Sequence, residues 1–171
     1  MNLELEQSFI KRVDALDKGD RVALKRNAGL VLTKASGAAC SAFYKCSPSC
    51  TAWNEDRWFF GACVRALWKP EQSMNISFID ALRAIKEKEG YGGMDQRLTI
   101  ILDGTWDEDG FFCRKLDRMM MLMKQKEKVI DIPLFIHDMN NWDDEDKRVQ
   151  KNWAQAYYRI DSKKKEKKNV D

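Results

Sequence analysis

The stretch of sequence that decides the fold covers residues 111–158 and reads FFCRKLDRMMMLMKQKEKVIDIPLFIHDMNNWDDEDKRVQKNWAQAYY. Its apolar residues recur at intervals of three and four, and they are Phe112, Leu116, Met119, Met120 and Met123, then Ile132, Phe135, Ile136 and Met139, then Val149, Trp153, Ala156 and Tyr157. Because such intervals keep side chains on one face of a helix, the stretch predicts three amphipathic helices in series. The polar faces carry basic residues, namely Arg114, Lys115, Arg118, Lys147, Arg148 and Lys151. A basic face opposite an apolar face is typical of a helical body that presents positive charge to an anionic partner.

The remainder of the chain predicts the same kind of structure. Only three prolines interrupt 171 residues, and the one strand-like run, LTIIL at 98–102, could equally be a buried helical segment. We therefore predict an all-α helical bundle of about eight to nine helices in two lobes. The predicted N-terminal lobe covers 1–90 and the C-terminal lobe covers 91–161, with 69–76 as a second candidate for the boundary. Residues 162–171 are expected to form a basic, disordered tail.

The helix ends are predicted from capping residues. The chain suggests helices over 2–16, 20–27, 38–45, 54–68, 77–89, 95–102 and 107–126, one that starts near Pro133, and a last one that starts at Asp143 or Asp144. Asp20, Ser77 and Asp95 are the other predicted N-caps, because a short polar side chain can accept from the free N–H groups of a first turn. Gly29 is a plausible C-cap.

The charge of the chain is concentrated at its end. The chain has 30 Lys and Arg against 27 Asp and Glu, a net charge of +3. Residues 162–171 contain five Lys, one Glu and one Asp, so residues 1–161 hold 25 basic and 25 acidic side chains. A nucleic-acid surface on the helical body must therefore come from the arrangement of the charges, since the body has no excess of basic residues.

One helix places Arg57, Gly61 and Arg65 four residues apart, on a shared face. A glycine between two arginines leaves the backbone open, which would let a phosphate chain or another helix come close. The alternative is that Gly61 only relieves crowding beside the neighbouring aromatic residues. Both interpretations remain open at the level of the sequence.

The sequence contains no recognisable catalytic or metal-binding pattern. His137 is the only histidine, and no paired-carboxylate or HExxH pattern accompanies it. The spacing of Cys40, Cys46 and Cys50 does not match the paired cysteines of zinc sites, so buried thiols are expected. The glycines at 90–93 lack the pattern of a phosphate-binding loop. We expect a protein that is not an enzyme and that uses no cofactor and no metal.

The sequence also predicts where the protein resides. No stretch approaches the roughly 18–20 apolar residues that cross a bilayer, and the N-terminus lacks the layout of a signal peptide. We expect a cytoplasmic protein without a membrane partner, whose five cysteines are reduced.

Four blocks of the chain together resemble a known family. They are LDKGDRVALKR at 16–26, AFYKCSP followed by WNEDRWFFGACVRAL at 42–67, DQRLTIIL at 95–102, and RKLDRMMMLMK followed by DIPLFIHDMNNW and a basic helix that ends in aromatic residues. In order, spacing and total length these blocks are similar to the CasB family, the small subunit of the type I-E CRISPR surveillance complex Cascade.

The resemblance implies an all-helical, two-lobed protein without catalytic activity. It implies that two copies pack head to tail beside the backbone subunits that hold the CRISPR RNA, with the large subunit as a further partner. Such a subunit supports the RNA–DNA duplex and offers a basic track to the displaced strand of the target DNA. The family's basic positions fall on Lys25, Arg26, Arg57, Arg97, Arg118, Lys147 and Arg148.

The residues themselves add two further candidates for phosphate contacts, Arg65 and Arg114. Lysine and arginine along a groove bind any sequence, since they contact phosphates rather than bases. For each arginine the alternative is an ion pair with a nearby acid such as Asp56 or Asp117. A competing function is a free-standing helical adaptor or DNA-binding protein, which would act alone rather than within a complex.

Overall fold

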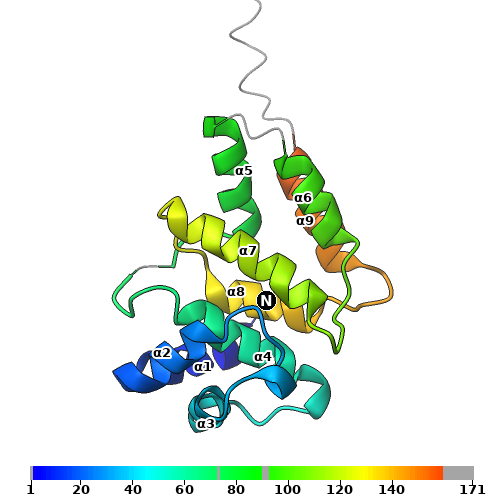
Figure 1. Cartoon of the computed structure of the whole chain (residues 1–171). Helices are drawn as coiled ribbons and strands as arrows, with labels where there is room; N and C mark the ends of the chain where they lie inside the picture. Colours follow the sequence, from blue (N-terminus) through cyan, green and yellow to red (C-terminus); the bar gives the residue numbers. More distant parts are fainter. Residues whose placement is uncertain (1, 73, 90–92, 160–171) are drawn as a thin grey trace, which may run out of the picture.

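The computed structural model describes residues 2–72, 74–89 and 93–159, in which helices are joined by loops (Figure 1). The helices are α1 (Glu4–Asp14), α2 (Lys18–Arg26), α3 (Gly37–Cys46), α4 (Ala52–Arg65), α5 (Phe78–Glu89), α6 (Met94–Leu102), α7 (Phe111–Gln125), α8 (Ile132–Asn140) and α9 (Arg148–Tyr158), with a short 3-10 helix at Leu32–Lys34. Within the described residues the only β pairing is an isolated parallel bridge between Ile76 and Ile130. The prediction of an all-α bundle of eight to nine helices is confirmed, and the LTIIL run is α6.

Several helix ends differ from the predicted ones. Asp17 caps α2, since its side chain accepts from the backbone N–H of Asp20, so the prediction of Asp20 as the cap was wrong. Asp95 lies inside the first turn of α6, after the cap position at Gly93. The last helix begins at Arg148, so neither Asp143 nor Asp144 caps it, and both form ion pairs with arginines.

Two predicted helix starts are confirmed. The hydroxyl of Ser77 accepts from the backbone N–H of Asp80 at 3.0 Å and donates to the Asp80 carboxylate at 2.8 Å, which fixes the start of α5. The carboxylate of Asp131 accepts from the backbone N–H of Leu134, and Pro133 occupies the first turn of α8. Pro133 fits there because the first N–H groups of a helix need no partner within it.

The helices are arranged around α8 and α7 (Figure 1). Helices α1 to α4 form one end of the molecule, and α5, α6 and α9 extend from the other, with α7 crossing between them. Helix α8 packs against α1 and α4, while α5 packs along α9. The boundary predicted at residue 90 would separate α5 from α9, whereas the one at 69–76 would keep them together. The position of a boundary stays a prediction, and the predicted tail at 162–171 lies outside the described residues.

The close packing of α8 on α4 depends on Gly61. A Cβ atom on this glycine would lie 2.6 Å from both Cγ1 and Cδ1 of Ile136. Real Cβ atoms do not approach so closely, so the missing side chain lets the two helices meet. The open face of α4 therefore receives another helix in this structure, one of the two approaches that the sequence left open.

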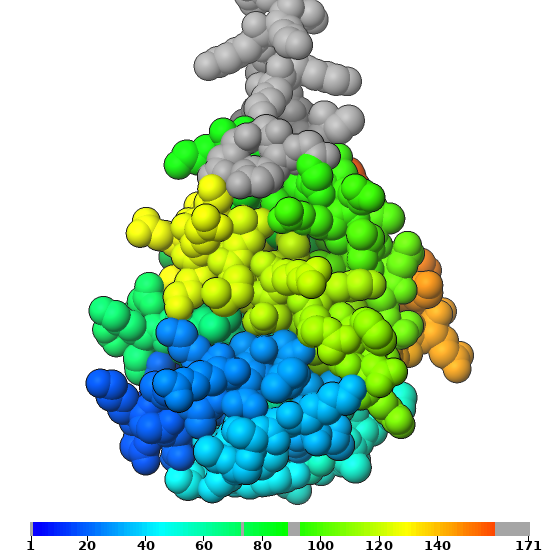
Figure 2. Space-filling model, in the orientation of Figure 1, coloured from blue at the N-terminus to red at the C-terminus, as the bar shows by residue number. Residues whose placement is uncertain are grey.

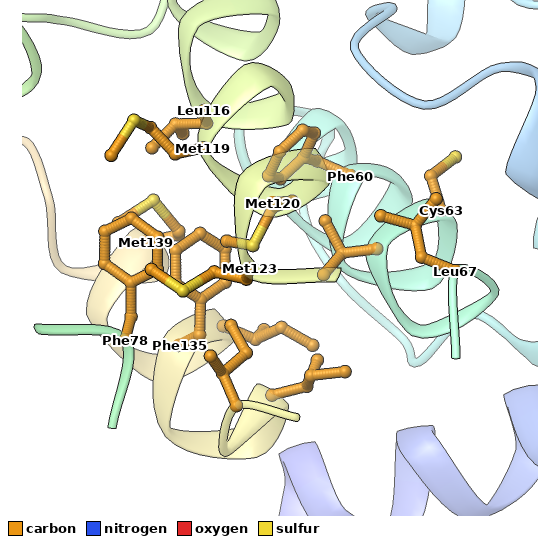
Figure 3. Close-up of a cluster of buried hydrophobic side chains, with 14 of the residues drawn as sticks. Phe60, Cys63, Leu67, Phe78, Leu116, Met119, Met120, Met123, Phe135 and Met139 are labelled. Atoms are coloured by element: carbon orange, nitrogen blue, oxygen red, sulfur yellow. The ribbon is translucent and has the colours of Figure 1, made fainter. Parts of the chain in front are cut away.

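The methionine run of α7 is mostly core (Figure 3). Met120 and Met123 are fully buried, and Met119 is 3% exposed. Figure 3 shows these side chains turned toward Phe135 and Met139 of α8 and Phe78 of α5. The buried residues from both ends of the molecule join in one continuous hydrophobic cluster. The flexible thioethers suit the irregular space where three helices meet.

Candidate nucleic-acid interface

The groove between α6 and α7 brings Arg97 and Arg118 together. It has a volume of about 420 Å³ and is lined by Arg97, Ile100, Ile101, Lys115, Arg118 and Met119. The spacing within each helix explains the arrangement, because residues three and four positions apart share a face. No acidic side chain lines the groove, so its three cations face no opposite charge. Among the described residues, Arg97, Lys115 and Arg118 form no ion pair.

A second basic cleft lies between α2, the end of α4 and the end of α7. Its volume is about 740 Å³, and its charged lining consists of Lys18, Arg21, Lys25, Lys69 and Lys124 against Asp14 and Glu127. The pKa of Lys124 is lowered first by burial and then by the ammonium group of Lys25. Two like charges held this close favour an anion beside them, because an anion would offset their repulsion.

Arg65 lies inside the molecule and not on its surface. Its side chain is 1% exposed and pairs with Asp14 through two contacts of 2.7 and 3.0 Å. It also donates to the carbonyl oxygen of Pro70 at 2.8 Å. A guanidinium group buried in this way joins α1 to the end of α4 and offers nothing to a phosphate.

Arg57 is also enclosed. Its side chain is 2% exposed and forms an ion pair with Asp143, and its guanidinium carbon lies 5.0 Å from the ring centre of Trp53 and 5.5 Å from that of Trp106. Cation–π contacts of this kind stabilise a buried arginine. Since Arg57 and Arg65 are internal, neither contributes to the basic surface of the molecule.

The other predicted residues are at the surface in different settings. Lys25 and Arg26 end α2 and are exposed. Arg114 stacks on Phe111, with 4.6 Å between the guanidinium carbon and the ring centre. Lys147 and Arg148 start α9, but Arg148 is paired with Asp144, which neutralises part of the charge.

Seven basic residues lie on three helices that share one side of the molecule. We call this set the basic face, and it consists of Lys25 and Arg26 on α2, Arg97 on α6, and Arg114, Lys115, Arg118 and Lys124 on α7. Figure 2 shows α2 in blue, α7 in yellow-green and α6 in green on the side turned to the viewer. Helix α9, with Lys147 and Arg148, lies at the edge of this view, in orange.

Lys115 and Lys124 were not among the predicted site residues. Lys115 precedes Arg118 by three positions and so shares its face, a signal that the sequence does contain. Lys124 shares no helix with Lys25, and only the packing of α7 beside α2 brings the two lysines together. No pattern in the sequence could have predicted that Lys25 and Lys124 lie close together.

The described residues offer no preformed metal centre. In these ranges no group of three or more His, Cys, Asp or Glu side chains lies together. Burial raises the pKa of Cys46 to about 11 and that of Cys113 to about 12, so both thiols are protonated near neutral pH. His137 lies 3.4 Å from the Glu6 carboxylate, an interaction between α8 and α1.

No helix within the described ranges combines the length and the apolar character that a bilayer crossing requires.

The described residues thus form a small all-helical protein with lysines and arginines on α2, α6 and α7. Residues 20–158 match the sequence model of CRISPR-associated protein Cse2 (CRISPR_cse2), and the chain belongs to this family. The match spans most of the chain, so the resemblance to the CasB family is confirmed. No curated protein sequence matches the chain.

Solved structures share the fold. A Cse2-family protein from Thermus thermophilus, TTHB189, aligns with a TM-score of 0.74 at 19% identity and covers 91% of this chain and 97% of its own. CasB from M. ruber aligns with a TM-score of 0.73 at 17% identity over 99% and 100% of the two chains. A chain of a structure described as a CRISPR RNA-guided surveillance complex aligns with a TM-score of 0.73 at 23% identity over 91% and 92%. These likenesses concern the fold alone.

Proposed function

We propose that this chain is the non-catalytic small subunit of a CRISPR RNA-guided surveillance complex, in which it supports the RNA–DNA duplex and holds the displaced strand of the target DNA. Its membership of the Cse2 family supports the proposal, and so does its similarity to a chain of such a complex. Its partners would be the backbone and large subunits, a second copy of itself, the CRISPR RNA and the target DNA.

The α6–α7 groove is the observation on which the strand-binding role rests. Any target must be accepted, so the displaced strand has to be held without regard to its sequence, and pairing with the guide RNA supplies the specificity. Lysine and arginine side chains meet this need because they contact phosphates. Arg97, Lys115 and Arg118 point into one groove without an acidic neighbour in its lining, which leaves their charges available.

The remaining residues of the basic face would extend the track. Lys25 and Lys124 line the second cleft, and Arg26 lies beside Lys25 at the end of α2. Arg114 lies four residues before Arg118 on α7 and shares its side of the helix. Lys147 and Arg148 would contribute less, because acids surround the start of α9.

The test starts with assembly. The tagged full chain is expressed with a CRISPR RNA and the proteins encoded beside it, and the purified particle is analysed for a stoichiometric ribonucleoprotein. The affinity of the particle for matched target DNA is then measured over a series of salt concentrations. The variant R97E/R118E is compared with the wild type, and K11E, which reverses an exposed charge on α1, is the matched control.

We expect R97E/R118E to assemble normally but to capture target DNA more weakly. Each lost phosphate contact lowers the slope of log affinity against log salt by about 0.7 to 0.9. The double variant should therefore reduce the slope by about 1.5, while K11E leaves it unchanged. An assembled double variant with wild-type affinity and slope would refute the strand-binding role. A chain that purifies alone would favour the free-standing adaptor instead.

A further inference from the structure

Phosphate binding would involve only the basic residues of the α6–α7 groove. The apolar residues that also line the groove have no role in it. Ile101 and Met119 form a buried floor, with 1% and 3% of their surfaces exposed. Ile100 lies at the rim and is 42% exposed, one of eight large apolar residues exposed in the described part of the chain. A site for phosphates alone gains nothing from exposed isoleucine, since apolar surface in water is unfavourable.

The size and charge of the groove restrict the occupant. Its volume of about 420 Å³ falls within the range of roughly 300–1,000 Å³ that is usual for small-ligand sites. An apolar floor suits a flat, weakly polar group, and the three cations at the rim suit the anionic groups attached to it. A nucleotide within a strand has this composition, with a base that covers apolar surface and phosphates on either side of it.

We propose that the α6–α7 groove takes an unstacked base of a single DNA strand, with the adjoining phosphates on Arg97, Lys115 and Arg118. The inference rests on the proposed function and adds to it a preference for single strands over duplex. A duplex offers its phosphates to the cations but keeps its bases stacked inside, out of reach of the floor.

The apolar floor of the groove also explains why the groove would accept a DNA strand of any sequence. Ile100, Ile101 and Met119 have no hydrogen-bonding group in their side chains that could read the edge of a base. Every base has an apolar face, so contact with that face is made by all four bases. The groove would therefore hold the displaced strand by its bases without selecting among targets.

The experiment uses the purified full chain and three fluorescent probes with equal numbers of phosphates. They are a single strand of thymidylates, a strand of the same length in which abasic residues replace every thymidylate, and a blunt duplex. Affinities are measured by fluorescence anisotropy at one low salt concentration. The variant I100S shortens the rim of the groove, and M121S is its matched control, because Met121 is 47% exposed on α7 but does not line the groove.

We expect the wild type to bind the thymidylate strand about tenfold more tightly than the abasic strand, the lower part of the range for a base on an aromatic surface. I100S should remove most of this difference by weakening thymidylate binding alone, whereas M121S should keep it. R118E should weaken the binding of both strands, since both carry phosphates.

The outcomes separate the two proposals. Equal wild-type affinity for the thymidylate and abasic strands overturns the base-binding inference and needs no variant to interpret. If R118E still weakens both strands in that case, the strand-binding role stands. If R118E weakens neither strand, the proposed function fails as well. A labelled acidic amphipathic peptide is measured in the same way as a fourth probe. If it binds more tightly than either strand and loses affinity in I100S, the groove is a peptide site and the base-binding inference is overturned.

Discussion

Arg65 and Arg118 are both arginines on amphipathic helices, yet the structure gives them opposite roles. Arg65 is enclosed. Its guanidinium group forms an ion pair with Asp14 and donates to the carbonyl oxygen of Pro70. Arg118 is exposed and lines a groove that contains no acid. Burial decides between a structural and a binding role, because a buried charge must find partners within the protein.

We predict that R65A destabilises the fold, whereas R118A does not. Asp14 loses both of its contacts with Arg65 and keeps the longer one with Arg21, at 3.3 Å, so the free energy of unfolding should fall by about 1–3 kcal/mol in R65A. For R118A, an exposed position without an ion pair, a change within about 0.5 kcal/mol is expected. Urea unfolding followed by circular dichroism measures both values. A stable R65A with weakened DNA binding would contradict the structural role.

At the scale of elements, Asp95 joins the consecutive helices α5 and α6 to α9, which is distant in sequence. Its carboxylate on α6 accepts from the Lys86 ammonium of α5 at 2.6 Å and from the Tyr157 hydroxyl of α9 at 2.9 Å. These bonds, with that of Lys86 the largest, lower the pKa of Asp95. The Lys86 ammonium also lies over the Tyr157 ring, 4.8 Å from its centre. The residue that we predicted to cap α6 instead ties α6 to its neighbours.

We predict that Y157F lowers the free energy of unfolding at pH 7 by about 0.5–1 kcal/mol, a small value because the Asp95 side chain is half exposed. A carboxyl whose pKa is lowered by folding stabilises the fold above its unfolded pKa, near 4, and loses this effect as the pH falls through its folded pKa. The difference between Y157F and the wild type should therefore shrink below about pH 4.

Urea unfolding of Y157F at pH 7 and at pH 3.5 measures this dependence. The matched control is Y158F, since Tyr158 is the neighbouring tyrosine and is 49% exposed. Its substitution should leave the free energy of unfolding close to that of the wild type at both pH values. A difference for Y157F that stays the same at pH 3.5 would show that the bond to Asp95 is not the cause.

At the scale of the whole molecule, one hydrophobic core joins the two ends of the chain. The buried cluster includes Phe9 and Phe43 from the N-terminal helices and Trp142 and Trp153 from the C-terminal ones. Helix α8 packs against α1 and α4. Such a shared core couples the two ends, because neither can lose its contacts without exposing apolar surface of the other.

We predict that the chain unfolds in a single transition. Urea curves from tryptophan fluorescence, which reports on the six tryptophans, and from circular dichroism should have the same midpoint. I136V, at the contact of α8 with Gly61, should lower the free energy of unfolding by about 0.5–1.5 kcal/mol and shift both curves equally. Two separate midpoints would show that the predicted lobes unfold independently.

The sequence by itself determined the fold class, the number of helices, most of their ranges and the family resemblance. Each of these depends on local patterns: apolar residues spaced by three and four, helix-start signals such as Ser77 and Pro133, and the order of four blocks. The pattern of amphipathic helices placed Arg118 on a polar face, and the family resemblance added Arg97 as a candidate. Local patterns are readable since they act between residues a few positions apart.

Only the tertiary structure decided which charges are available. Asp14 reaches Arg65 across 51 positions, and Asp143 reaches Arg57 across 86, so neither pairing leaves a local signal. The proximity of Lys25 to Lys124 also leaves no local signal in the sequence, and neither does the groove that brings Arg97 and Arg118 together. In a body with equal numbers of acids and bases, helix packing selects which arginines are neutralised and which face solvent, because ion pairs form between whichever side chains the packing brings together.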